Sequence, residues 1–228
     1  MNGAESFIET LHACGVDVCF ANPGTSEMQL VAAVDRQHGM RAVLGLFEGV
    51  VTGAADGYGR MADKPAVTLL HLGPGLGNGL ANLHNARKAG SPIINMVGDH
   101  ATYHKHFNAP LTSDTEGVAR PMSDWVRTST SERDLAQAGA EAFAAAQGYP
   151  GKVATVIVPA NHAWTEGSAP VAPLPVPAVA RTPDETIAAA AAALKDGEGP
   201  KCLFLGGRAL REDALVEAGR IAAATGCR

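Results

Sequence analysis

Continuous apolar runs alternate along the first 160 residues with segments in which apolar residues recur at helical spacing. Residues 66–70 and 92–97 are the clearest runs, and their length and β-branched content are typical of strands buried on both faces. Regular alternation of strands and amphipathic helices places helices on both sides of a parallel sheet. The pattern therefore predicts a doubly wound α/β fold.

The expected elements follow this rhythm as far as residue 159. Strands are predicted at residues 17–20, 40–44, 66–70, 92–97 and 153–158, and helices at 3–14, 26–36, 48–61, 77–88 and 132–146. Residues 99–115 are polar and show no periodicity. Loops of this length in a compact domain usually cover a site or are mobile, and we interpret this segment as an active-site loop.

A proline-rich stretch divides the chain. Five prolines in residues 168–183 exclude a helix or a central strand and favour an extended linker. We predict a first domain at residues 1–166, a linker at 167–183, and the incomplete start of a central α/β domain at 184–228. That last part has a predicted strand at 201–205 between helices at 184–194 and 211–225. Because one strand cannot pair its own backbone edges, we expect the chain to be a truncated part of a longer protein.

Composition narrows the functional classes. The net charge is −5 and the pI is about 5.9, which argues against nucleic acid or an anionic membrane surface as a partner. No secretory signal and no apolar run of spanning length are evident, so a cytoplasmic location is predicted. The four cysteines lack metal-binding spacing and are expected to be reduced thiols.

Three motifs each follow a predicted strand: residues 22–27 (NPGTSE), 46–60 around Glu48, and 71–79 (HLGPGLGNG). The carboxyl ends of parallel strands share one edge of the sheet, where open α/β sheets bind ligands. Glu48 begins a helix of small residues, where an acid can simply complement the helix dipole. The glycines of the third motif do not complete a dinucleotide fingerprint, and they indicate either a tight turn or a close approach of the backbone to a ring system or a partner subunit.

Together, the three motifs resemble the pyrimidine-binding domain of thiamine-diphosphate enzymes, in the branch of acetolactate synthase large subunits and benzoylformate decarboxylase. The resemblance covers roughly residues 3–165. It implies that Glu48 hydrogen-bonds the ring nitrogen of the cofactor's aminopyrimidine and drives it to the imino form, which takes the proton from the thiazolium C2. A buried carboxylate suits this task because low polarity strengthens the hydrogen bond. Four residues are implied to lie beside the cofactor with Glu48: Pro23, Gly24, Gly75 and Asn78.

The resemblance also implies two substrate contacts. His71 matches a catalytic histidine of benzoylformate decarboxylase, whereas acetolactate synthases usually have a small hydroxyl residue there. The alternative for His71 is a structural histidine at the end of a strand. Thr25 lies where benzoylformate decarboxylase has a substrate-contacting serine, although Thr25 or Ser26 could equally be a helix N-cap.

The implied activity is that of a 2-oxo acid decarboxylase or carboligase, a lyase or transferase, that works as a homodimer or homotetramer with the cofactor shared across the interface. In such enzymes Mg²⁺ and the diphosphate are held by a domain with a Gly-Asp-Gly motif. This chain has no such motif, so it is expected to be inactive alone; FAD use is left undetermined. The alternative is a non-catalytic fragment or split subunit that serves binding and dimerisation.

The segment after residue 99 contains three histidines that could suggest a metal site. His100, His104 and His106 lack the partners of such a site, and none is predicted. Phe107 and Asn108 match the corresponding Ala-Phe-Gln-Glu run of acetolactate synthases poorly, which argues against the synthase reaction.

Overall fold

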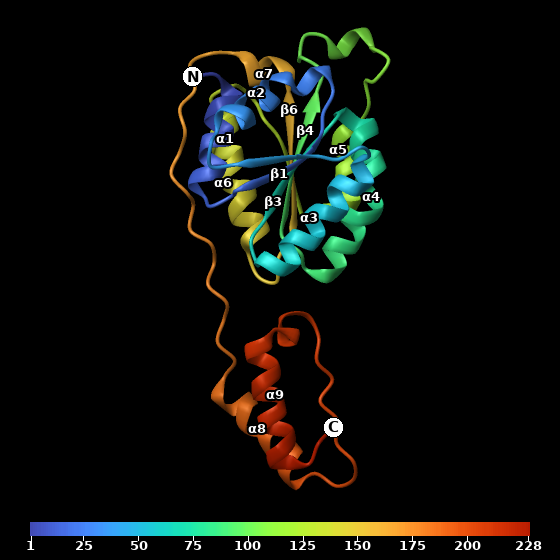
Figure 1. The fold of residues 1–228 in the computed structure, drawn as a ribbon, viewed down its shortest axis with the longest axis vertical. Coiled ribbons are helices and arrows are strands. Elements are labelled where there is room, and N and C mark those ends of the chain that lie inside the picture. The colour runs from blue at the N-terminus through green and yellow to red at the C-terminus, as the bar shows by residue number, and fades with distance from the viewer. The chain divides into compact units, whose positions relative to one another are not determined.

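The computed structural model describes residues 1–228, which form two compact units, Met1–Pro177 and Ala178–Arg228. The first unit is built on a six-stranded, fully parallel sheet in the order β2-β1-β3-β4-β6-β5 (Figure 1). Its strands are β1 (Val18–Asn22), β2 (Arg41–Leu44), β3 (Ala66–Leu70), β4 (Ile93–Asp99), β5 (Trp125–Thr128) and β6 (Val153–Pro159). The predicted doubly wound α/β fold is confirmed.

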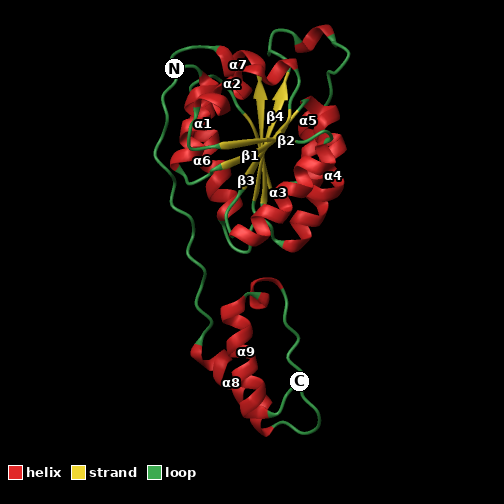
Figure 2. Ribbon diagram, in the orientation of Figure 1, coloured by secondary structure: helices red, strands yellow, loops and turns green.

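Helices cover both faces of this sheet (Figure 2). One face carries α1 (Gly3–Ala13), α2 (Met28–Arg36) and α6 (Asp134–Gln147), and the other carries α3 (Glu48–Ala62), α4 (Leu72–Ala89) and α5 (Thr115–Ala119). Neighbouring residues of one strand serve opposite faces, as in β3, where Leu69 packs in the first core and Leu70 in the second. Two layers of helices thus bury both faces of the strands, which is why these strands are apolar throughout.

A chain of polar side chains crosses the otherwise apolar centre of the sheet. The Thr68 hydroxyl donates to Asn95 Oδ1 at 2.7 Å, and Asn95 Nδ2 donates to Thr155 Oγ1 at 2.9 Å. The hydroxyl oxygens of Thr155 and Ser123 lie 2.8 Å apart. The first three residues are completely buried, and buried polar groups are tolerated when they are bonded in this way.

The strand order has a switch point at β1. From β1 the chain moves to β2 on one side, and β3 then pairs with β1 on the other side. In open α/β sheets ligands bind outside the carboxyl ends of the strands at such a switch point. The ends of β1 and β3 carry two of the three sequence motifs.

The structure corrects several predicted boundaries. Helix α4 begins at Leu72, five residues before the expected start, because Pro74 and the glycines around it fit the first turn of a helix and do not form a tight turn. Strand β5, an edge strand of half-buried residues, was not predicted because it has no continuous apolar run. Helices α5 and α7 (Ala160–Trp164) were also missed, since five residues are too few to show helical periodicity.

The second unit contains α8 (Asp184–Asp196), a 3₁₀ turn at Gly207–Leu210 and α9 (Glu212–Thr225). The strand predicted at 201–205 is wrong for this structure. The segment makes two backbone hydrogen bonds with the last residue, from Leu203 N to Arg228 O and from Arg228 N to Lys201 O, and it has no strand beside it to complete a ladder. Residues 167–183 form no helix or strand, and the domain boundaries at 166 and 184 stay predictions.

No helix of either unit has the length and apolar content that crossing a bilayer requires.

His162, on α7, predicts a pH dependence of stability. Its ring is 7% exposed and Nδ1 lies 2.9 Å from Ser129 Oγ. Burial lowers the pKa of His162 below its ordinary value of 6.5, and the nearby carboxylates of Glu132 and Asp134 offset this only in part. Below about pH 6.5 the unfolded chain therefore takes up the proton more readily than the folded one. We expect the free energy of unfolding to fall as the pH drops from 7 through the lowered pKa, in urea denaturation at each pH.

Two variants separate this effect from the other histidines. His162→Asn should reduce the fall, whereas His38→Asn, at an exposed position, should keep it. Equal falls in both variants and the parent chain would contradict the assignment to His162.

Candidate functional site

The three sequence motifs meet at the carboxyl edge of β2, β1 and β3. Gly45, just after β2, donates from its N–H to Ala21 O at 2.9 Å, and its carbonyl accepts from Asn22 Nδ2 at 2.8 Å. These bonds hold the segment that leads into α3 against the end of β1. Glu48 is consequently held near the carboxyl ends of β1 and β3.

Glu48 is the first residue of α3, and its side chain is almost completely buried at 9% exposure. Its Oε2 accepts a hydrogen bond from Asn78 Nδ2 at 3.0 Å. Its Oε1 faces Gly75, where a Cβ would stand only 3.0 Å away. The structure thus brings together Glu48, Gly75 and Asn78, three of the residues predicted to lie beside one ligand.

Close packing of α3 on α4 holds this arrangement. The Thr52 hydroxyl donates to Gly79 O at 3.0 Å, and Asn82 Nδ2 donates to Gly49 O at 2.6 Å. A Cβ at Gly79 would lie 2.7 Å from the Thr52 methyl group. The small residues of both helices therefore serve to bring the two backbones together near Glu48.

His71 is the N-cap residue of α4 and is bonded to a buried carboxylate. Its Nδ1 lies 2.7 Å from Glu27 Oε2, and Glu27 is completely buried. The same Oε2 accepts from Gly24 N at 2.8 Å, whereas Oε1 has no hydrogen-bond partner. Because a carboxylate only accepts, Nδ1 carries the proton of a neutral His71 and Nε2 is left with a free lone pair.

Gly24 and Gly98 leave space for the paired side chains of His71 and Glu27. The His71 ring lies against the backbone of Gly24, where a Cβ would stand 2.3 Å from ring atoms. A Cβ at Gly98 would stand 1.7 Å from Glu27 Oε1. Any larger residue at either position would displace a polar side chain of the site.

The N-cap prediction at Thr25 or Ser26 is wrong. Gly24 is the N-cap of a 3₁₀ turn, Thr25–Glu27, and the side chain of Glu27 reaches back to its N–H. Glu27 was not predicted as a site residue, because it resembled an ordinary first-turn acid. The available signal was the coincidence of an acid and a histidine at the ends of two strands, but only the topology makes β1 and β3 neighbours.

Comparison with known proteins gives a family match for the first half of the chain. Residues 1–122 match the family described as "Thiamine pyrophosphate enzyme, N-terminal TPP binding domain". The chain belongs to this family. The predicted resemblance to thiamine-diphosphate (TPP) enzymes is thereby confirmed, and the buried Glu48 lies within the matched residues.

Two curated relatives are informative about this TPP-binding domain. The putative acetolactate synthase large subunit IlvX of Mycobacterium tuberculosis is 53% identical over 228 residues, which are 100% of this chain and 44% of that protein. Benzoylformate decarboxylase of Pseudomonas aeruginosa is 31% identical over 136 residues, or 59% of this chain and 25% of that protein. This chain spans less than half the length of these relatives.

A solved structure shares the fold of the TPP-binding domain. The thiamine diphosphate-dependent 4-hydroxybenzoylformate decarboxylase of Rhodococcus jostii RHA1 has a TM-score of 0.80 at 24% identity. The match covers 89% of this chain and 39% of that one. At this identity the likeness establishes the fold alone.

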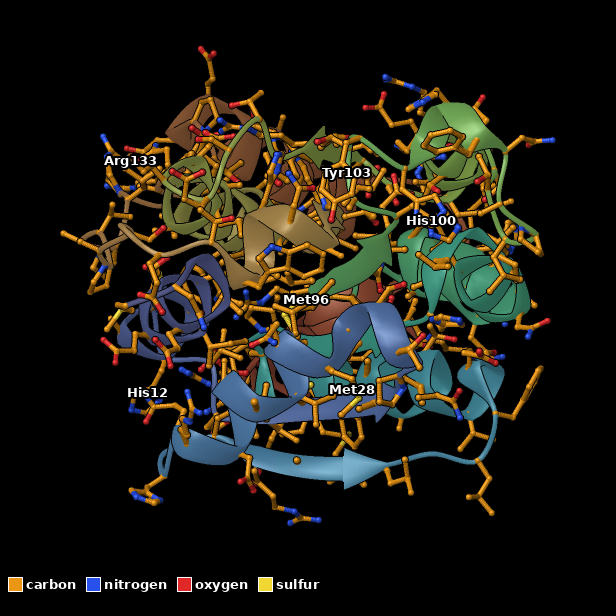
Figure 3. All side chains as sticks on the ribbon, turned by 90° about the horizontal axis from the view of Figure 1, so that it is seen from above. His12, Met28, Met96, His100, Tyr103 and Arg133 are labelled. Atoms are coloured by element: carbon orange, nitrogen blue, oxygen red, sulfur yellow. The ribbon has the colours of Figure 1, made fainter.

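The remaining predicted residues of the TPP-binding domain lie at the same edge. Thr25 is exposed in the 3₁₀ turn, and Pro23 is half-buried just before it. Figure 3, which is seen from above, labels Met28 at the start of α2 and His100 on the segment that follows β4. The active-site loop expected at 99–115 has only a 3₁₀ turn at Lys105–Phe107 before α5 begins, and its role stays a prediction.

The start of α4 has an unusual backbone. Leu72 has a positive φ of 53°, a conformation that costs a residue with a side chain about 1–2 kcal/mol. Leu72 is nevertheless 1% exposed and tightly packed. Such strain is characteristic of functional positions, and here it turns the chain sharply between His71 and the glycines that face Glu48.

Proposed function

We propose that this chain is the pyrimidine-binding part of a thiamine-diphosphate-dependent decarboxylase or carboligase that acts on a 2-oxo acid. Family membership supports the cofactor, and the pairing of His71 with Glu27 supports proton transfer to or from a substrate. The observation that carries the proposal is the buried carboxylate of Glu48, which is held between Asn78 and the bare backbone of Gly75.

The residues around Glu48 fit an aminopyrimidine ring. Gly75 has no side chain to fill the space in front of Oε1, and Asn78 engages only Oε2. Oε1 therefore remains to accept a hydrogen bond from a ring nitrogen when that nitrogen is protonated. When bound, thiamine diphosphate supplies a carbanion that attacks carbonyl carbons and stabilises the negative charge left by decarboxylation. The task of Glu48 is to bind the ring nitrogen and to control its proton.

His71 is proposed as the acid–base residue. The bond from Nδ1 to Glu27 fixes the orientation of the ring and its tautomer, which leaves Nε2 to exchange a proton with a bound 2-oxo acid. Thr25, exposed at the same edge, is proposed to contact this acid, and Pro23 and Gly24 to lie against the cofactor. The diphosphate and Mg²⁺ are proposed to be held by a different domain.

A second subunit is also proposed. Apolar side chains are exposed around β2 and along α3, among them Leu46 at 91%, Met61 at 80% and Val50 at 59%. An apolar surface of this kind beside a site is typical of a subunit interface. We propose that a partner covers it in a homodimer or homotetramer.

The pyrimidine site can be tested on this chain by nuclear magnetic resonance. Titration with 4-amino-5-hydroxymethyl-2-methylpyrimidine, the ring portion of thiamine, is expected to give saturable shifts of the Gly75 and Asn78 amides. Glu48→Gln should remove them, because it replaces an acceptor oxygen and the negative charge. Glu9→Gln, at an exposed position of α1, is the matched control and should keep them.

Two outcomes would overturn this site. Absence of saturable shifts in the parent chain would mean that the ring is not recognised here. Equal shifts in the parent and in Glu48→Gln would mean that another group binds the ring.

A further inference from the structure

Unpartnered buried polar atoms gather in one part of the first unit. Seven buried side-chain atoms lack a hydrogen-bond partner, and five of them lie between residues 99 and 115. One of the five, Asp99 Oδ2, is ion-paired with Lys105. The other four are His100 Nε2 and the hydroxyl oxygens of Thr112, Ser113 and Thr115. Buried hydroxyls are nearly always bonded, so this cluster calls for a ligand or bound water.

Two of these hydroxyls face the first turn of α4. A Cβ at Gly73 would stand 2.0 Å from Ser113 Oγ and 3.7 Å from Thr115 Oγ1. Thr115 is 4% exposed, so its hydroxyl is sealed from bulk water. Because Gly73 has no side chain, both hydroxyls lie next to bare helix backbone.

No side chain caps the start of α4. The helix has 18 residues, no acidic residue in its first turn, and no side-chain hydrogen bond from its N-cap residue, His71. The N–H groups of Leu72 and Gly73 precede the first intrahelical bond, which runs from Gly75 N to His71 O. A helix start in this state attracts an anion.

Asp114, the carboxylate adjacent in sequence to both hydroxyls, does not occupy this position. Its side chain is the N-cap of α5 and accepts from Gly117 N at 2.8 Å. Two hydroxyls that can donate, together with the N–H groups of Leu72 and Gly73, therefore lie at this helix start. Since the N–H groups can only donate and the hydroxyls can also donate, this set can bind an oxyanion.

We propose that Ser113, Thr115 and the first turn of α4 form a subsite for a carboxylate, that of the 2-oxo acid substrate. The inference rests on the proposed function for its choice of ligand. Gly75, in the same helical turn, lies against Glu48 Oε1 and His71 Cβ, at 3.0 and 3.3 Å from its Cβ position, so the subsite adjoins the proposed reaction centre. The segment 99–115 would have to move to admit the acid, since the hydroxyls are buried.

The test is a titration of this chain with sodium pyruvate, followed by the amide signals of Gly73, Ser113 and Thr115. Acetone is the neutral analogue without the carboxylate, and sodium chloride controls for ionic strength. Pyruvate is expected to give saturable shifts that neither control gives. The double variant Ser113→Ala/Thr115→Val should weaken pyruvate binding at least tenfold, which corresponds to about 1.4 kcal/mol of binding free energy. Thr182→Val, an exposed hydroxyl outside the cluster, is the matched control and should change nothing.

The variants are expected to fold. Removing buried hydroxyls that have no partner should leave the free energy of unfolding unchanged or raise it. Shifts of equal size with sodium chloride, or unchanged pyruvate binding in the double variant, would overturn the proposal and assign the hydroxyls to bound water. Glu48→Gln should not weaken pyruvate binding, because it removes a neighbouring negative charge, and the double variant should leave pyrimidine binding intact. The carboxylate subsite and the pyrimidine site can therefore fail independently.

Discussion

Replacing Glu48 by glutamine is expected to lower the turnover of the proposed thiamine-diphosphate enzyme by about 10²- to 10⁴-fold, the usual contribution of a positioned proton-transfer group. Glutamine keeps the size of the side chain, and its amide oxygen can still accept from Asn78. It cannot hold the negative charge that favours a proton on the bound ring nitrogen. The measurement is turnover of the complete enzyme with saturating cofactor and 2-oxo acid, together with the rate of hydrogen–deuterium exchange at C2 of the bound cofactor.

The exchange rate distinguishes this role from a structural one. Slowed exchange with an unchanged unfolding midpoint is the expected result, because the variant alters charge and not volume. The matched variant Glu9→Gln should exchange at the parent rate. Exchange at the parent rate in Glu48→Gln would remove Glu48 from the proposed activation.

Gly98→Ala is expected to destabilise the first unit by about 3–4 kcal/mol, the sum of an overpacked core and lost buried bonds to a carboxylate. The new methyl group would stand 1.7 Å from Glu27 Oε1 and 2.5 Å from its Cδ. Glu27 is completely buried, so it would have to leave both Gly24 N and His71. Urea denaturation measures the loss.

A double-mutant cycle attributes the loss to this contact. In a Glu27→Ala background, Gly98→Ala should cost about 2 kcal/mol less than in the parent chain, because the clash is gone. Gly57→Ala is the matched control, since no atom lies within 4 Å of its Cβ position and alanine favours a helix. Additive effects of Glu27→Ala and Gly98→Ala would show that the strain arises elsewhere.

Much of this arrangement could be predicted from local pattern. The strands at 66–70 and 153–158 are uninterrupted apolar runs, and they were placed to within one residue because burial on both faces leaves no ambiguity of period. The three motifs could be assigned to one edge of the sheet because they follow parallel strands. Glu48, Gly75 and Asn78 accordingly lie together as expected.

What escaped prediction depends on contacts between distant segments. The bond from His71 to Glu27 joins residues 44 positions apart. The unpartnered hydroxyls of Ser113 and Thr115 could be recognised as a candidate subsite only once the structure placed them beside the backbone of Gly73. Likewise, the apolar residues at 201–205 have the composition of a strand, but a strand exists only where another backbone pairs with it.

The hydrogen-bonded side chains of Thr68, Asn95 and Thr155 in the centre of the sheet fix the register of the strands that carry the site. Thr68 and Asn95 are register partners on β3 and β4, and Asn95 and Thr155 are register partners on β4 and β6. His71 stands three residues beyond Thr68, and Gly98 three residues beyond Asn95, so both reach Glu27 at the same height. A slip of one strand by one residue would move His71 or Gly98 by about 3.3 Å along the strand direction. It would also break the hydrogen bonds that Asn95 makes with Thr68 and Thr155. The alignment of His71 with its carboxylate is therefore set some 10 Å below, in the interior of the sheet.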